Sequence, residues 1–101
     1  MDLNMKAEKN GNEVVIVLNG ELNTLTAPKL HSFIGEELQG EASLVLDFAD
    51  CDFVSSAGLR VLLAVFKERK ANKAAMALKN VGQNFMDVLE NTGLDGVFDT
   101  I

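Results

Sequence analysis

An Asn-Gly pair near the start of the chain constrains the fold more than any other short segment. Asn10-Gly11 lies between two apolar runs, a position in which this pair favours a tight turn joining antiparallel strands. The run over residues 13–20 is almost continuously apolar and predicts a well-buried strand. The run before the turn alternates apolar and polar residues, the apolar ones being Leu3, Met5 and Ala7. We therefore expect an N-terminal hairpin.

Helical and extended patterns alternate after this hairpin. Residues 26–40 predict a helix with Thr26 as N-cap, Pro28 in the first turn and Gly40 as C-cap. Its apolar stripe is formed by Leu30, Phe33, Ile34 and Leu38. Residues 43–49 follow as a strand whose continuous apolar character predicts that both of its faces are covered.

A second helix is predicted from about residue 56 to residue 72. Its apolar stripe is formed by Leu59, Leu62, Leu63 and Phe66, and its last turn carries cations that suit the helix dipole. Residues 74–80 form a weaker strand prediction. Residues 82–94 predict a third amphipathic helix, ended by Gly93 in a left-handed conformation with Leu94 folded back onto it. Residues 96–101 predict a short strand or terminal turn.

This order of elements predicts the α/β class. Because 101 residues bury one ordinary core, we expect a single domain over residues 1–101. Right-handed crossovers should make the later strands parallel. The expected fold is a mixed sheet, mostly parallel with an antiparallel N-terminal edge strand, packed with amphipathic helices.

Charge and cysteine content exclude several functions. Nine Lys and Arg residues and fifteen Asp and Glu residues give a net charge of −6. This charge disfavours binding to nucleic acid and to anionic membranes, and it favours a protein that is monomeric when free. The longest apolar run, residues 61–66, is too short for membrane insertion, and no signal peptide is recognised. A cytoplasmic protein is expected. Cys51 is expected to be a small buried hydrophobe, and His31 a solvated or capping residue on the first helix. One Cys and one His leave no protein-only zinc site, and we expect no metal or cofactor.

The segment from Asp47 to Gly58 is the strongest candidate site. It is predicted to lie at the carboxyl end of a central parallel strand, where open α/β sheets place their ligands. Ser55 and Ser56 then fall at a helix N-terminus, where free N–H groups favour negative charge, and Gly58 leaves room for close backbone approach. A phosphate, bound or covalently attached, would suit this position. A plain serine N-cap explains the same residues, and the spacing alone leaves both readings open.

The residues of this segment do not match the motifs of known enzyme active sites. Ser56-Ala57-Gly58 supplies half of a hydrolase nucleophile elbow, but Val54 occupies the first glycine position. The only histidine precedes the serine, which is the wrong chain order for that family. No phosphate-binding glycine motif occurs. The acidic residues of the segment are expected in a solvated loop, with a weak cation site as the alternative; they are Asp47, Asp50 and Asp52. We expect no catalytic residue and no enzyme.

Three segments together resemble a known family. The chain contains LVLDFADCDFVSSAGLRVLL, which resembles the signature of STAS domains, the fold of bacterial anti-sigma factor antagonists. Earlier it contains VVIVLNGELNTLTAPKL, similar to the second strand and G-E-L-D loop of that family. Later it contains NVGQNFMDVLENTGLDGVFD, similar to its late helix and G-L-D turn. The resemblance covers nearly the whole chain in the right order.

The resemblance implies a partner-switching protein. In this family the unmodified antagonist binds a serine-kinase anti-sigma factor and frees the sigma factor. The kinase then phosphorylates one serine, which releases the antagonist, and a PP2C-type phosphatase restores it. On the family motif D-S-[ST]-G-L, Ser55 takes the aspartate position, Ser56 the modified serine and Ala57 the second hydroxyl position. Ser56 is therefore the expected phosphoacceptor, and we also expect it to help begin the helix.

Two departures from the motif reduce negative charge near this serine. Ser55 replaces an acid, and Asn23 stands where the G-E-L-D loop usually has aspartate. The expected partner-binding face comprises two neighbouring loops and the start of the helix: Glu21, Asn23, Thr24, Ser55, Ser56, Ala57, Gly58 and Arg60. STAS domains also serve in lipid and anion transporter complexes, so an accessory transporter subunit is the alternative that the resemblance leaves open.

Overall fold

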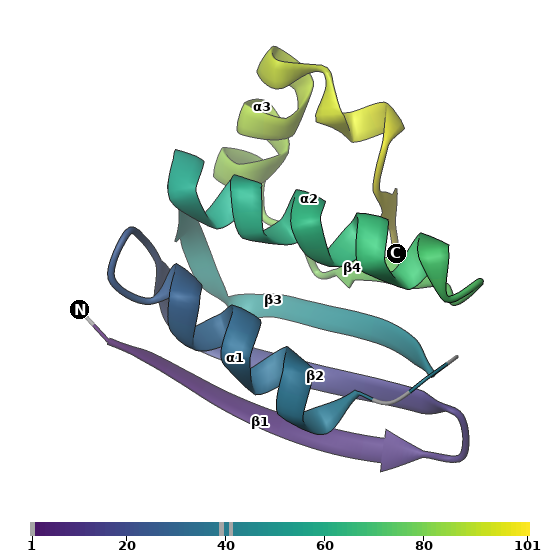
Figure 1. Ribbon diagram of the computed structural model, residues 1–101. Coiled ribbons are helices and arrows are strands. Elements are labelled where there is room, and N and C mark those ends of the chain that lie inside the picture. Colours follow the sequence, from purple (N-terminus) through teal and green to yellow (C-terminus); the bar gives the residue numbers. More distant parts are fainter. Residues whose placement is uncertain (1, 39, 41) are drawn as a thin grey trace.

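The computed structural model describes residues 2–38, 40 and 42–101 (Figure 1). The elements are, in chain order, β1 (Leu3–Asn10), β2 (Glu13–Leu22), α1 (Ala27–Glu37), β3 (Ser43–Val54), α2 (Ser56–Ala71), β4 (Met76–Lys79), α3 (Gln83–Thr92), a short 3-10 helix η1 (Leu94–Gly96) and β5 (Asp99–Thr100). No helix within these residues has both the length and the apolar character to cross a membrane.

The sheet has the predicted topology. Its five strands lie in the order β1-β2-β3-β4-β5, with β1 antiparallel to β2 at one edge and all other neighbours parallel. The hairpin closes at the pair Asn10 and Glu13, and Gly11 in the turn has a φ of 61°. A turn with positive φ favours glycine, which is why the Asn-Gly signal was informative. The predicted α/β fold with an antiparallel N-terminal edge strand is confirmed.

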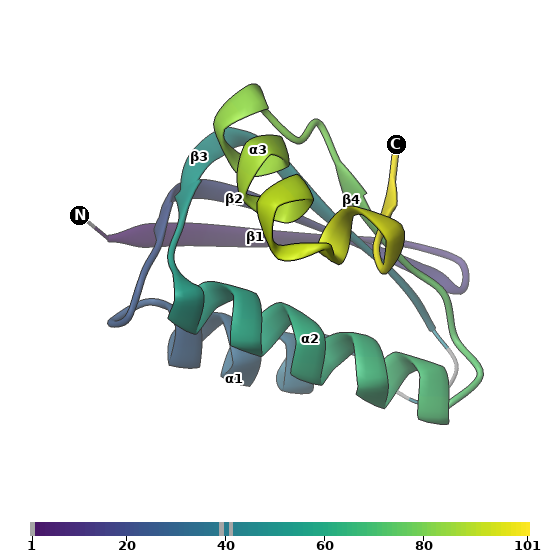
Figure 2. The same ribbon diagram turned by 90° about the horizontal axis from the view of Figure 1, so that it is seen from above.

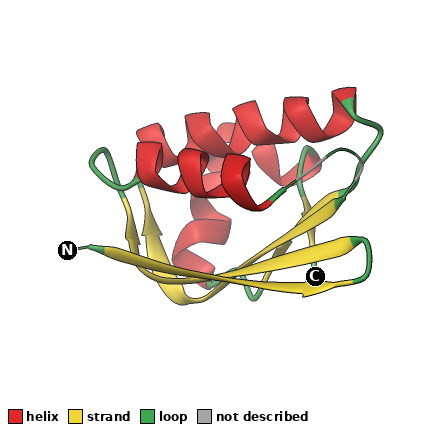
Figure 3. Cartoon of the chain, turned by 60° about the horizontal axis from the view of Figure 1, so that its bottom comes forward, coloured by secondary structure: helices red, strands yellow, loops and turns green. Residues whose placement is uncertain are grey.

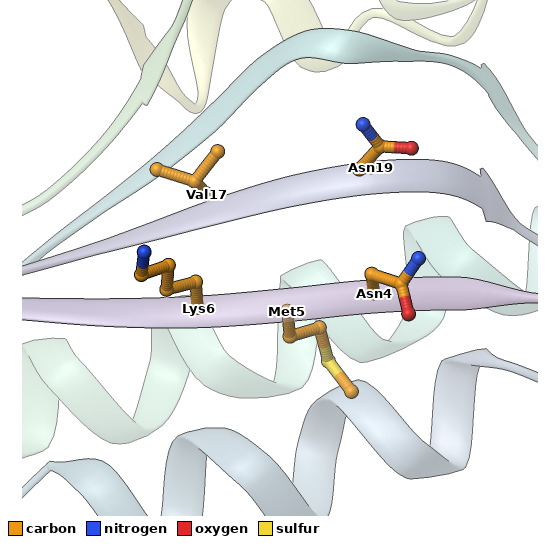
Figure 4. A pocket seen from close by; sticks show the side chains of 5 residues that line it. All are labelled: Asn4, Met5, Lys6, Val17 and Asn19. Carbon is orange, nitrogen blue, oxygen red and sulfur yellow. The ribbon is translucent and has the colours of Figure 1, made fainter.

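Helices α1 and α2 cover one face of the sheet. Figures 2 and 3 show both of them on the same side. Figure 4 shows the opposite face, where a shallow hollow is lined partly by Asn4, Lys6 and Asn19, while Met5 points toward α1. The prediction that both faces of β3 are covered is therefore wrong. Val45 is nevertheless buried, because Val15 and Ala77 flank it in register on the neighbouring strands.

Strand β3 is five residues longer than predicted and takes in the whole acidic segment. Asp47, Asp50 and Asp52 lie on the strand, so the prediction of an acidic loop is wrong. Irregularities in the β2–β3 register on either side of Asn19 let the polar stretch stay in the ladder. Two of the carboxylates are used structurally, because Asp47 accepts from Asn80 Nδ2 at 3.0 Å and Asp52 from Asn84 Nδ2 at 2.7 Å. Within the described residues no three metal-binding side chains gather.

Helix α1 begins after Thr26 as predicted but ends early. Its C-cap is Leu38, in an extended conformation, and the prediction that Gly40 caps the helix is wrong. The side chain of Leu38 is buried in the core, so the chain turns inward there before it reaches the glycine. The end of α3 is as predicted: Gly93 has a φ of 75°, and Leu94 packs against the core.

Helix α2 presents a slightly different face to the core than its apolar pattern indicated. Leu59 and Leu62 are buried as predicted, but Leu63 and Phe66 are only half-buried. The buried row continues instead through Val65 and Arg69. Arg69 is accommodated because its Nη1 donates to the carbonyls of Gly40 and Ala42 at 3.1 and 3.0 Å. This guanidinium ties the end of α2 to the connection between α1 and β3.

Candidate functional site

The β2–α1 loop and the β3–α2 junction meet at one end of the molecule. Leu22 and Val54, the last residues of the two parallel strands, are paired in register. The Ser55 N–H donates to the Leu22 carbonyl at 2.8 Å. Figures 1 and 2 both place the loop beside the start of α2. The prediction that these two segments are neighbours, despite their separation in sequence, is confirmed.

Ser55, and not Ser56, caps helix α2. Ser55 has an extended backbone (φ −84°, ψ 172°), and its Oγ accepts from the Gly58 N–H at 3.2 Å. Ser56 is the first helical residue and is exposed. The expectation that Ser56 helps begin the helix is thus corrected: its neighbour satisfies the free N–H. The Ser55 hydroxyl is engaged in the fold, whereas the Ser56 side chain faces solvent.

Gly58 lets α2 approach β2 closely. It is buried, and a Cβ at this position would lie 2.7 Å from Cγ of Leu22 and 3.1 Å from the Leu22 carbonyl oxygen. Any side chain would therefore push the first turn of α2 away from the strand. Although Gly58 was counted in the partner-binding face, its burial gives it a positioning role. Thr24, Ser56 and Arg60 are the exposed members of that face.

The β2–α1 loop is held by its own polar side chains. Asn23 Oδ1 accepts from the N–H groups of Leu25 and Thr26 at 2.9 and 3.0 Å. Thr26 occupies the N-cap position of α1, but its buried hydroxyl donates to the Glu21 carbonyl at 2.7 Å and does not cap the helix. Asn23 therefore holds the loop through an acceptor oxygen of its side chain, as an aspartate would, without adding charge.

Neither the cysteine nor the histidine belongs to the site. Cys51 is fully buried, and this burial raises the pKa of its thiol to about 11, so the thiol stays protonated at neutral pH. The prediction of a small buried hydrophobe is confirmed. His31 is exposed on α1, with its Nε2 3.0 Å from Oε2 of Glu68 on α2.

Replacing Ser55 by alanine is expected to lower the free energy of unfolding by about 1 kcal/mol, because the Gly58 N–H loses its acceptor. For a domain of this size, that corresponds to a fall in Tm of about 4–8 °C. Ser55→Asp should retain most of the stability, since a carboxylate also caps a helix. Thermal melts of both variants and of Ser56→Ala measure this. A loss in Ser56→Ala equal to that in Ser55→Ala would contradict the capping assignment.

A comparison with protein-family models matches residues 4–101 to the STAS domain. The chain belongs to the STAS domain family. Among its curated relatives, the anti-sigma-B factor antagonist of Bacillus subtilis is 25% identical over 99 residues, which are 98% of this chain and 91% of that protein. BtrV of Bordetella bronchiseptica, which carries the name of an anti-sigma factor antagonist, is 30% identical over 86 residues, 84% of this chain and 74% of its own length.

Solved structures show the same STAS fold. SpoIIAA in its unphosphorylated form superposes with a TM-score of 0.81 at 22% identity, covering 97% of this chain and 88% of that one. Bacillus SpoIIAA in its phosphorylated form gives 0.74 at 22% identity, covering 97% and 91%. The curated relatives of this STAS chain are named for antagonising a regulatory factor and not for a reaction. This agrees with the expectation that the chain is not an enzyme.

Proposed function

We propose that this STAS domain is an anti-sigma factor antagonist that works by partner switching. The unphosphorylated chain binds a serine-kinase anti-sigma factor, phosphorylation of Ser56 releases it, and a PP2C-type phosphatase restores binding. The main support for this proposal is that the two serines have different roles. Ser55 caps the helix, while Ser56 is exposed beside the β2–α1 loop. The γ-phosphoryl group of ATP passes to Oγ of Ser56, ADP leaves, and the hydroxyl proton goes to a base of the kinase.

The local electrostatics favour a phosphate at Ser56. A phosphoserine adds about −1.5 to −2 charges, and the positive end of a helix dipole stabilises such a charge by about 0.3–1 kcal/mol when exposed. Asn23 and Ser55 are neutral where the family motif has acids, so they add no repulsion. The fold should therefore tolerate the phosphate. We expect the phosphate to change the binding of the anti-sigma factor and not the stability of the chain.

The named relatives support the switching mechanism over the transporter alternative. Both curated relatives reported above carry the name of an anti-sigma factor antagonist. SpoIIAA has been solved with and without a phosphate, so this fold accommodates both states. In an accessory transporter subunit, Ser56 would be an ordinary interface residue and would need no kinase. Because the kinase consumes ATP, we place the switch in the cytoplasm, where the net charge of −6 favours a free monomer.

Phosphopeptide mass spectrometry tests the modified residue. A purified serine-kinase anti-sigma factor of the same organism, incubated with ATP and this chain, should modify Ser56 and leave Ser55 unmodified. The Ser56 hydroxyl is exposed, whereas the Ser55 hydroxyl accepts from Gly58. Ser55→Ala should still be phosphorylated, and Ser56→Ala should not. Phosphate incorporation that persists in Ser56→Ala and disappears in Ser55→Ala would overturn the assignment.

A further inference from the structure

Leu25 is exposed in a way that the core of the fold does not require. Its side chain is 78% exposed, the largest value among the large apolar residues described, ahead of Ile101 at 68% and Phe53 at 52%. Single exposed apolar side chains are common and carry no meaning alone. Leu25 differs because of the loop that holds it and because of where that loop lies.

The loop presents Leu25 from a fixed backbone. The Leu25 N–H donates to Oδ1 of Asn23 at 2.9 Å, and the next residue, Thr26, is almost fully buried. Oγ1 of Thr26 in turn accepts from the Asn23 N–H at 2.8 Å. A side chain presented from an ordered backbone loses less conformational entropy on binding than one on a mobile loop. Burying Leu25 against a partner would therefore cost less conformational entropy than burying a leucine on a mobile loop.

Leu25 lies at the same end of the molecule as Ser56. Its loop follows Leu22, whose carbonyl accepts from the Ser55 N–H at 2.8 Å. Phe53, the next most exposed apolar residue on this side, pairs in register with Glu21 immediately before the junction. Ile101 is at the C-terminus, on the opposite side in Figures 1 and 2. A protein whose active site covers Ser56 therefore binds at the end of the molecule that carries the Leu25 loop.

We propose that Leu25 is an apolar anchor for the serine kinase that acts on Ser56, seated in an apolar recess beside the active site of that kinase. This inference rests on the function proposed above. The residues flanking Leu25 in the loop are uncharged: Asn23, Thr24 and Thr26. Burying this loop in an interface therefore desolvates no charge. In protein interfaces a buried anchor is surrounded by contacts that mainly exclude water, and the uncharged residues of this loop can make such contacts.

Kinase kinetics on Leu25→Ser test the anchor. The probe is a serine-kinase anti-sigma factor already shown to phosphorylate the unmodified chain on Ser56. Full burial of a leucine side chain predicts a rise in KM for the protein substrate of about 10- to 100-fold, with kcat nearly unchanged. Leu25→Met, a conservative substitution at the same position, should retain most of the affinity of the parent chain for the kinase. Ile101→Ser removes an apolar side chain of similar exposure at the opposite side and should leave KM unchanged.

The outcomes separate the anchor from the proposed function. If Leu25→Ser has the same KM as the parent chain, or if it lowers kcat alone, the proposal that Leu25 is an anchor is overturned. The proposed switch at Ser56 then still stands. If Ile101→Ser raises KM as much as Leu25→Ser, the effect is not specific to this loop and the anchor is again overturned. If the mass spectrometry described under the proposed function finds that the serine-kinase anti-sigma factors of the organism do not phosphorylate Ser56 of the parent chain, both proposals are refuted. Thermal melts of the three variants should match the unmodified chain, since surface substitutions of this kind change stability little.

Discussion

Phosphorylation of Ser56 is expected to weaken binding to the serine-kinase anti-sigma factor about a hundredfold. Ser56 is exposed at the start of α2, within the face that we assign to partner binding. In a desolvated interface, a group with about two negative charges costs free energy unless cations pair with it. A loss of about 3 kcal/mol corresponds to the hundredfold change. Isothermal titration of the kinase with the two forms of the chain measures it directly.

Two controls accompany this titration. Ser56→Ala should bind as tightly as the unmodified chain, because it removes only a small exposed hydroxyl. The melting temperatures of the phosphorylated and unphosphorylated forms should lie close together, since the phosphate would occupy the positive end of a helix dipole. A large fall in melting temperature on phosphorylation would mean that the switch acts by unfolding the chain, contrary to the mechanism proposed here.

The largest loss of stability is expected for Gly20→Ala, by about 2–3 kcal/mol. Gly20 has a φ of 133°, a conformation that other residues adopt only at a cost of about 1–3 kcal/mol. A Cβ at this position would also collide with the backbone carbonyl of Asp2. Urea unfolding of the variant measures the loss, which is large for a domain of this size.

Gly35→Ala is the matched control for this substitution. Gly35 lies within α1, its φ is not positive, and a Cβ there meets no atom within 4 Å among the described residues. Alanine is favoured over glycine in a helix by up to about 1 kcal/mol, so this variant should be more stable than the parent chain. Equal losses in Gly20→Ala and Gly35→Ala would contradict the structural account of Gly20.

The fold was predictable because its signals are local. Asn10-Gly11 specifies the hairpin, and the alternation of apolar patterns after it specifies the parallel strands. The length of β3 was not predictable, because Asp50 and Asp52 resemble loop residues and only the irregular pairing opposite Asn19 keeps them in the sheet. The end of α1 was missed for a similar reason: burial of Leu38 is a tertiary effect that the later glycine does not reveal.

The candidate site was located from the sequence, but its division of roles was not. Two adjacent serines are equivalent as N-cap candidates, and the choice of Ser55 depends on the hydrogen bond from its N–H to Leu22, on another strand. Leu25 gave no signal, because a single apolar residue in a short polar loop has no periodicity. Its exposure follows from the bonds of Asn23 and Thr26 around it.

Release of a sigma factor is the measurement that tests the switch most directly. A preformed complex of the serine-kinase anti-sigma factor with its sigma factor is mixed with this chain, and free sigma factor is quantified. The unphosphorylated chain should displace the sigma factor at near-stoichiometric amounts. The chain phosphorylated on Ser56 should need about a hundredfold more, in line with its lower affinity. Equal displacement by both forms, or displacement by neither, would contradict partner switching through Ser56.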